Sequence, residues 1–232
     1  MKRDGLKQAF DHTKQFSLVL AILMTIALTP GVDAKGAGEH PQDAAVPKSL
    51  SGTSNRSFEQ LMEEAMAIMH RATENANKTG DPDHDFVTMM IPLHQGAIDM
   101  AKVVLRDGKD SDIREFAETI IEDQQAEMGF MEGWLTKYKP TEGESPNKTF
   151  VTAMERIDAS MDRDMRTAKK IKDPDHDFVM MMIPHHQGAI DMAKLVLIYG
   201  KDPEVRRLAG QIVAAQQSEI QIMQRWLTTR DQ

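Results

Sequence analysis

Methionine and histidine side chains that could bind a metal ion are concentrated in a stretch that occurs twice in the chain. Residues 81–102 read DPDHDFVTMMIPLHQGAIDMAK, and residues 173–194 read DPDHDFVMMMIPHHQGAIDMAK. The two copies agree at 20 of 22 positions and lie 92 residues apart. The same spacing relates further methionines and both tryptophans outside the stretch. This pattern indicates an internal duplication, so any function must account for two related halves.

The second copy has the fuller set of possible metal ligands. On a helix, residues four or seven positions apart share a face, which places Met181, His185 and Met192 near one line. Met182 and His186 form the adjacent line. Thioether sulfur and imidazole nitrogen together favour soft ions, Cu(I) and by analogy Ag(I), over ions such as Mg²⁺ or Ca²⁺. We therefore expect a copper or silver site here, although methionines and histidines on such a face also occur as ordinary core residues.

The first copy retains only part of this set. Met90 and His94 lie four residues apart and can still act as a pair. Leu93, however, stands where the second copy has His185, and a leucine side chain cannot coordinate a metal. We expect the second copy to bind more tightly and the first to be mainly structural.

Other side chains could complete or support the site. Met223, on the helix that follows the second copy, is a further candidate thioether ligand. Each copy also contains an aspartate after its histidine, and the helix after each copy contains a glutamate. These carboxylates could orient histidine ring N–H groups, or could serve only as capping and solvated groups. They are Asp99, Asp191, Glu127 and Glu219.

Six amphipathic helices are needed to position these residues. Apolar side chains recur at helical spacing through each repeat, and no stretch alternates convincingly with the period of a strand. Pro92 and Pro184 fall inside the repeated helices, so a kink is expected beside the histidines. The fold class is predicted to be all-α, with helices at about 58–76, 82–106, 112–137, 150–171, 175–199 and 203–228.

The N-terminal segment has the layout of a secretory signal. A basic start precedes an apolar run at 18–28, and we expect cleavage after Ala34. The apolar run is shorter than the roughly 20 residues that span a bilayer. We therefore expect a periplasmic or secreted protein with no membrane contact after cleavage. The predicted segments are a signal peptide at 1–34, a disordered tether at 35–56, helical repeat 1 at 57–137, a linker at 138–147 and helical repeat 2 at 148–230.

Composition narrows the classes of function. The formal net charge of −8 argues against nucleic acid or an anionic membrane surface as a partner. The chain contains no cysteine, so it has neither disulfides nor thiolate metal sites, and its 18 methionines are the available soft ligands. It has no Glu-x-x-His pair for a di-iron bundle, no phosphate-binding loop and no His-Glu-x-x-His zinc helix. We expect no enzymatic activity.

Two functions remain open on these grounds. One is an exported protein that binds copper or silver for metal buffering, sequestration or tolerance. The other is a non-catalytic helical interaction module, with core histidines and a methionine-rich groove for a protein partner.

A family resemblance rests on two motifs. The run MIPHHQGAIDMA is followed about 30 residues later by a Gln-x-x-Glu pattern that leads to Met223, Trp226 and Leu227. Together they resemble the bacterial secreted domain-of-unknown-function 305 family. The resemblance implies a ferritin-like fold marked by the double histidine, here His185 and His186. Some members look like periplasmic copper- or silver-binding proteins, so metal-transport or chaperone proteins are expected partners.

The same resemblance implies how the six helices pack. A ferritin-like bundle would pair the proline-containing helix and its successor from each repeat, which gives four helices. The helices at 58–76 and 150–171 would then serve as a cover and a crossover.

Overall fold

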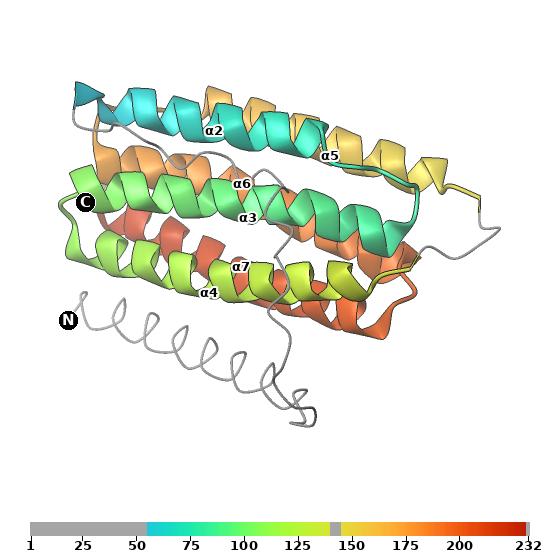
Figure 1. The fold of residues 1–232 in the computed structure, drawn as a ribbon. Coiled ribbons are helices and arrows are strands. Elements are labelled where there is room, and N and C mark those ends of the chain that lie inside the picture. Colours follow the sequence, from blue (N-terminus) through green and yellow to red (C-terminus); the bar gives the residue numbers. More distant parts are fainter. Residues whose placement is uncertain (1–54, 140–144, 231–232) are drawn as a thin grey trace, which may run out of the picture.

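The computed structural model describes residues 55–139 and 145–230, which form α-helices and no β-strand (Figure 1). This confirms the all-α class and the two repeats of three helices. The predicted signal peptide and nearly all of the tether lie outside the described residues. The helices are α2 (Phe58–Glu74), α3 (Pro82–Asp107), α4 (Ser111–Lys137), α5 (Lys148–Thr167), α6 (Pro174–Tyr199) and α7 (Pro203–Arg230).

The helices form three layers of two (Figure 1). The repeated stretches are α3 and α6, which pack against each other in the middle layer. On one side α2 covers α3 and α5 covers α6; on the other side α4 packs on α3 and α7 on α6. The four expected bundle helices are therefore α3, α4, α6 and α7, and the repeated stretches are two of them. The helices α2 and α5 hold equivalent covering positions.

The loop before each middle helix is shaped by an aspartate one turn inside that helix. Asp177 accepts hydrogen bonds from the backbone N–H of Ile171, at 2.8 Å, and of Lys172, at 3.1 Å. Lys172 has a φ of 63°, in the left-handed region that does not continue a helix. The helix predicted at 150–171 consequently ends at Thr167, because these residues turn back towards Asp177.

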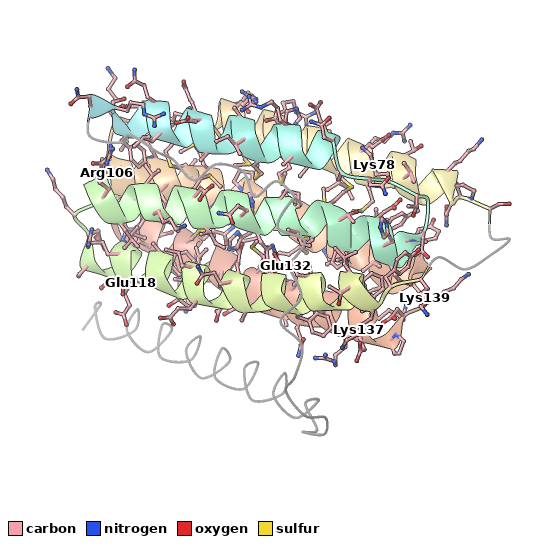
Figure 2. All side chains as sticks on the ribbon, in the orientation of Figure 1. Lys78, Arg106, Glu118, Glu132, Lys137 and Lys139 are labelled. Atoms are coloured by element: carbon pink, nitrogen blue, oxygen red, sulfur yellow. The ribbon has the colours of Figure 1, made fainter. Side chains whose placement is uncertain are left out.

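Methionine supplies much of the interior. Within residues 55–139 and 145–230, fourteen methionines are buried, most of them fully. They are Met62, Met66, Met69, Met89, Met90, Met100, Met131, Met154, Met161, Met165, Met181, Met182, Met192 and Met223. Charged side chains such as Arg106, Glu118 and Glu132 extend from the outside of the bundle (Figure 2).

Two glycines allow the covering helices to approach the middle layer closely. A Cβ atom at Gly96 would lie 2.4 Å from the sulfur of Met69, and one at Gly188 would lie 2.6 Å from the sulfur of Met161. These distances are too short for real contacts, so only glycine allows each methionine of α2 and α5 to lie against the backbone of α3 and α6.

The two repeats hold each other at the bundle ends. Asp83 of α3 accepts hydrogen bonds from the N–H of Lys201 and of the next residue, at 2.7 and 3.0 Å. Asp175 of α6 does the same for Lys109 and its successor, at 2.9 and 3.1 Å. The two sets occupy equivalent positions in the duplication. The repeats are therefore related by a pseudo-two-fold axis, and each fixes the loop between the middle and outer helices of the other.

Candidate metal centre

His185 lies at the centre of the molecule, where α6 contacts α3. Its side chain is fully buried, and its Nε2 donates a hydrogen bond of 3.1 Å to the backbone carbonyl of Leu93. Because positions 93 and 185 are equivalent in the duplication, this contact lies on the pseudo-two-fold axis. The other ring nitrogen, Nδ1, is buried without a hydrogen-bond partner.

Two further histidines lie in the same interior and are held by glutamates of the outer layer. The Nε2 of His94 donates to the Oε2 of Glu127 across 2.6 Å. The Nε2 of His186 lies 2.8 Å from the Oε2 of Glu219, an ion-pair distance without hydrogen-bond alignment. In both histidines Nδ1 is buried without a partner. A carboxylate on one nitrogen fixes the ring and makes the other nitrogen a better ligand.

Electrostatics keeps the His185 ring neutral. Burial, together with the nearby His186 and His94, lowers the pKa of His185 to about 3. The ring centroids of His185 and His186 are 5.8 Å apart. Since Nε2 carries the proton that is donated to Leu93, Nδ1 of His185 presents its lone pair to the interior. That is the form of histidine that binds metal ions.

The predicted methionine ligands all belong to this buried core. Met90, Met181, Met182, Met192 and Met223 are each at most 1% exposed. Among the described residues, no group of three or more histidine, aspartate and glutamate side chains is arranged to hold a metal ion. A bound ion would therefore need thioether sulfur in addition to imidazole nitrogen.

The two predicted aspartates, Asp99 and Asp191, are hydrogen-bonded to glutamines and not to the histidines. Asp99 accepts a hydrogen bond from Gln95 at 2.9 Å, and Asp191 accepts one from Gln187 at 3.0 Å. Both partners belong to the same helix as the aspartate. Of the four carboxylates considered, the structure thus places only Glu127 and Glu219 against histidines.

Two buried glutamines were not among the predicted site residues. Gln124 and Gln216 lie three residues before Glu127 and Glu219, on the same helix face, and are 3% and 2% exposed. Neither side-chain amide has a hydrogen-bond partner on its oxygen or nitrogen. An unpaired buried polar group costs about 1–3 kcal/mol. The only sequence signal was the Gln-x-x-Glu spacing, which places both side chains on the face that points inward.

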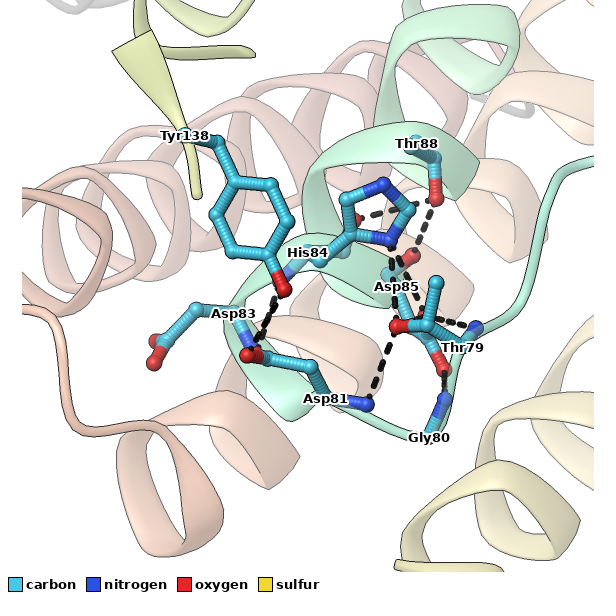
Figure 3. A network of polar contacts seen from close by, with 8 residues as sticks. All are labelled: Thr79, Gly80, Asp81, Asp83, His84, Asp85, Thr88 and Tyr138. Atoms are coloured by element: carbon cyan, nitrogen blue, oxygen red, sulfur yellow. Dashed lines mark hydrogen bonds and ion pairs between the residues drawn. The ribbon is translucent and has the colours of Figure 1, made fainter. Parts of the chain in front are cut away.

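A polar cluster at the start of α3 has a structural role. His84 Nδ1 lies 3.2 Å from Asp85, whose carboxylate accepts the backbone N–H groups of Thr79 and Gly80 (Figure 3). Tyr138 stacks on the His84 ring and donates a hydrogen bond of 2.9 Å to Asp81 (Figure 3). These groups satisfy one another and close the loop before the helix.

The fold and this buried histidine–methionine core define a class of helical protein with two internal repeats. The family described as Domain of unknown function (DUF305) matches residues 37–135 and 175–232. The chain belongs to this family. Within the described ranges, no helix combines the length and apolar character needed to cross a membrane.

Several known proteins are similar to the chain. A crystal structure of a DUF305 protein from Streptomyces coelicolor superposes with a TM-score of 0.52 at 27% identity, over 66% of this chain and 94% of that one. CopM in its Ag-bound form gives a TM-score of 0.49 at 28% identity, over 63% of this chain and 95% of that one. CopM in its Cu(I)-bound form gives 0.48 at 28% identity, over 63% and 96%. At TM-scores below 0.5, these two likenesses are too partial to assign a ligand to this chain.

A match to a curated protein is shorter. The uncharacterized protein L153 of Acanthamoeba polyphaga mimivirus is 41% identical over 56 residues, or 24% of this chain. The match spans 37% of the length of that protein.

Proposed function

We propose that this protein binds a soft monovalent metal ion, Cu(I) or Ag(I), in the centre of its bundle, with Nδ1 of His185 as the principal nitrogen ligand. One observation carries the proposal. Three buried histidines each have Nδ1 without any hydrogen-bond partner; Nε2 of His185 and of His94 is hydrogen-bonded, and Nε2 of His186 lies 2.8 Å from Glu219. Nitrogen lone pairs in a dry interior are costly unless an ion or a hydrogen-bond donor meets them.

The surrounding atoms favour a soft ion over a hard one. The thioethers of Met181, Met182 and Met192 lie on the same helix as His185, and sulfur with imidazole selects Cu(I) or Ag(I). The buried carboxylates of Glu127 and Glu219 are already engaged by histidines. A neutral His185 needs to lose no proton before it binds, so the ion does not compete with H⁺ at this nitrogen.

Buffering or sequestration, and not catalysis, is the proposed role. The ligands are enclosed by three helical layers, which suits retention of an ion more than turnover of a substrate. The secretory layout of the N-terminal sequence suggests that this takes place outside the cytoplasm, where metal-transport or chaperone proteins are the expected partners. The alternative of a methionine-rich partner groove is less favoured, because fourteen of the sixteen methionines in the described residues are buried.

The proposal is tested by anaerobic Cu(I) titration against a chromophoric chelator, with three proteins in parallel. The wild type should hold at least one ion per chain. His185→Leu should lose the tight site yet keep its helical circular dichroism, because Leu93 is accommodated fully buried at the equivalent position. Leu93→His should add an ion or tighten a weak site. Unaltered Cu(I) affinity in His185→Leu would mean that His185 is a core residue and not a ligand.

A further inference from the structure

Two glutamines of the outer layer, Gln124 of α4 and Gln216 of α7, carry amide groups that are not paired with any protein group. Their side chains are 3% and 2% exposed, and neither the oxygen nor the nitrogen of either amide is hydrogen-bonded. Buried polar groups are normally paired, because a buried amide without a partner loses the hydrogen bonds that it makes in water. The two glutamines hold equivalent positions in the duplication, so one explanation should serve for both.

Both glutamines lie close to the pseudo-two-fold axis. The guanidinium carbon of Arg207, near the start of α7, lies 5.4 Å from the ring centroid of Phe130, near the end of α4, and the two helices run side by side in opposite directions (Figure 1). Arg207 corresponds to Glu115 in the duplication, so the axis crosses α4 midway between positions 115 and 130. Gln124 is close to that midpoint, and the axis relates it to Gln216 at the matching place on α7.

The amides belong to the inward faces of these helices. Glu127 lies one turn beyond Gln124 on the same face of α4, and its carboxylate accepts a hydrogen bond of 2.6 Å from His94. Glu219 has the same placement relative to Gln216 on α7. The interior where α4 and α7 face the middle layer therefore contains two amide oxygens and two amide nitrogens without protein partners.

The chemistry of the amide group limits what can bind there. An amide oxygen only accepts hydrogen bonds, and an amide NH₂ group only donates them. A metal cation could meet the oxygens but not the NH₂ groups, and an anion could meet only the NH₂ groups. Water both donates and accepts, and a buried water molecule typically makes about three hydrogen bonds to polar groups that lack protein partners.

We propose that Gln124 and Gln216 form a binding site for ordered water inside the bundle, at the pseudo-two-fold axis between α4 and α7. Each NH₂ group donates a hydrogen bond to a water oxygen, and each amide oxygen accepts one from a water O–H. This site accounts for an amide at both positions in a core that is otherwise rich in methionine. It does not involve the Nδ1 atoms of the histidines, so it stands independently of the proposed metal binding.

The first test replaces each amide by a thioether of similar length. Gln124→Met and Gln216→Met should each lower the Tm of the metal-free protein by roughly 2–4 °C, because the hydrogen bonds to water are lost and its volume is left unfilled. Gln125→Met and Gln217→Met are matched controls at the adjacent exposed positions and should leave Tm nearly unchanged. A rise in Tm in either of the first two variants would show that the amides are buried without water and would overturn the proposal.

A second test detects the water itself. Water–protein NOE spectra of ¹⁵N-labelled, metal-free protein should show cross-peaks from water to the side-chain NH₂ groups of Gln124 and Gln216, with the sign given by long-lived bound water. The two methionine variants assign these signals, and Gln125 and Gln217 should show no such cross-peaks. Their absence at Gln124 and Gln216 would overturn the proposal even if both variants are destabilised, because the amides would then be paired with protein groups. Since no metal is added, these outcomes are separate from those of the Cu(I) titration.

Discussion

The two nitrogens of His185 have different roles, and this difference gives the residue its chemistry. Nε2 is used to contact the backbone of the other repeat, while Nδ1 faces the interior without a partner. A core histidine that served packing alone would be expected to have both nitrogens paired. His94 repeats the arrangement with glutamate in place of the carbonyl, and Nε2 of His186 lies 2.8 Å from Glu219. The unpartnered Nδ1 shared by the three histidines favours one common ligand environment over three unrelated packing arrangements.

The pKa of His185 predicts how the metal-free protein responds to acid. This pKa is about 3 in the folded chain because burial disfavours the imidazolium, against roughly 6.5 in an unfolded chain. Between these values the unfolded state binds more protons, so the free energy of unfolding falls as the pH drops from about 6.5 towards 3. His185→Leu should lose less stability over this range than the wild type, as measured by urea unfolding at a series of pH values. Parallel pH profiles for the two proteins would contradict a neutral buried His185.

At this scale the sequence indicated the residue types but not their partners. The spacing of Met181, His185 and Met192 is local, so helical periodicity could predict that they share a face. The contact between His185 and Leu93 joins residues 92 positions apart, and no local pattern encodes it. The unpaired amides of Gln124 and Gln216 were missed for the same reason, because burial depends on what the neighbouring helices cover.

Helix spacing depends on glycines whose roles differ although all lie within helices. Gly96 and Gly188 lie where a methionine of the covering helix packs, while Gly129 and Gly210 have open space around them. Most helix starts could be predicted from aspartate and asparagine caps. The end of α5 could not be predicted in this way. The carboxylate that accepts the backbone N–H groups of residues 171 and 172 is that of Asp177, which belongs to the next helix.

Alanine substitutions should separate these two groups of glycines. Gly96→Ala and Gly188→Ala should each destabilise the protein by about 1–3 kcal/mol, because overpacking outweighs the gain in helix propensity. Gly129→Ala and Gly210→Ala should instead stabilise it by about 0.5–1 kcal/mol. Thermal and urea unfolding of the four variants would measure this. Stabilisation by Gly188→Ala would show that α5 does not lie as close to α6 as described.

The whole molecule behaves as one unit because each repeat completes the other. Asp83 and Asp175 bind turns in the opposite repeat, and the central contact also crosses between repeats. The duplication and the six helices could be predicted from periodicity and self-similarity. The pairing of helices came from the family resemblance, and the reciprocal aspartate contacts were not foreseen, because they link residues 118 and 66 positions apart.

This reciprocity predicts similar losses from two distant substitutions. Asp83→Ala and Asp175→Ala should each lower the free energy of unfolding by about 1–3 kcal/mol, since each leaves two backbone N–H groups without an acceptor. Glu118→Ala, at an exposed position, should have little effect. Chemical unfolding followed by circular dichroism would compare the three. A two-step transition in either aspartate variant would indicate that the repeats can unfold separately, contrary to this description.

The central claim, that Nδ1 of His185 binds a soft metal ion, is tested most directly by NMR of the histidine rings. Protein labelled with ¹⁵N is titrated with Ag(I), and long-range ¹H–¹⁵N spectra report the state of each ring nitrogen, with His185→Leu used to assign the His185 signals. We predict that the Nδ1 signal of His185 shifts on binding while its Nε2 keeps the proton donated to Leu93. An unchanged Nδ1 signal at saturating Ag(I), or metal bound at Nε2, would contradict the claim.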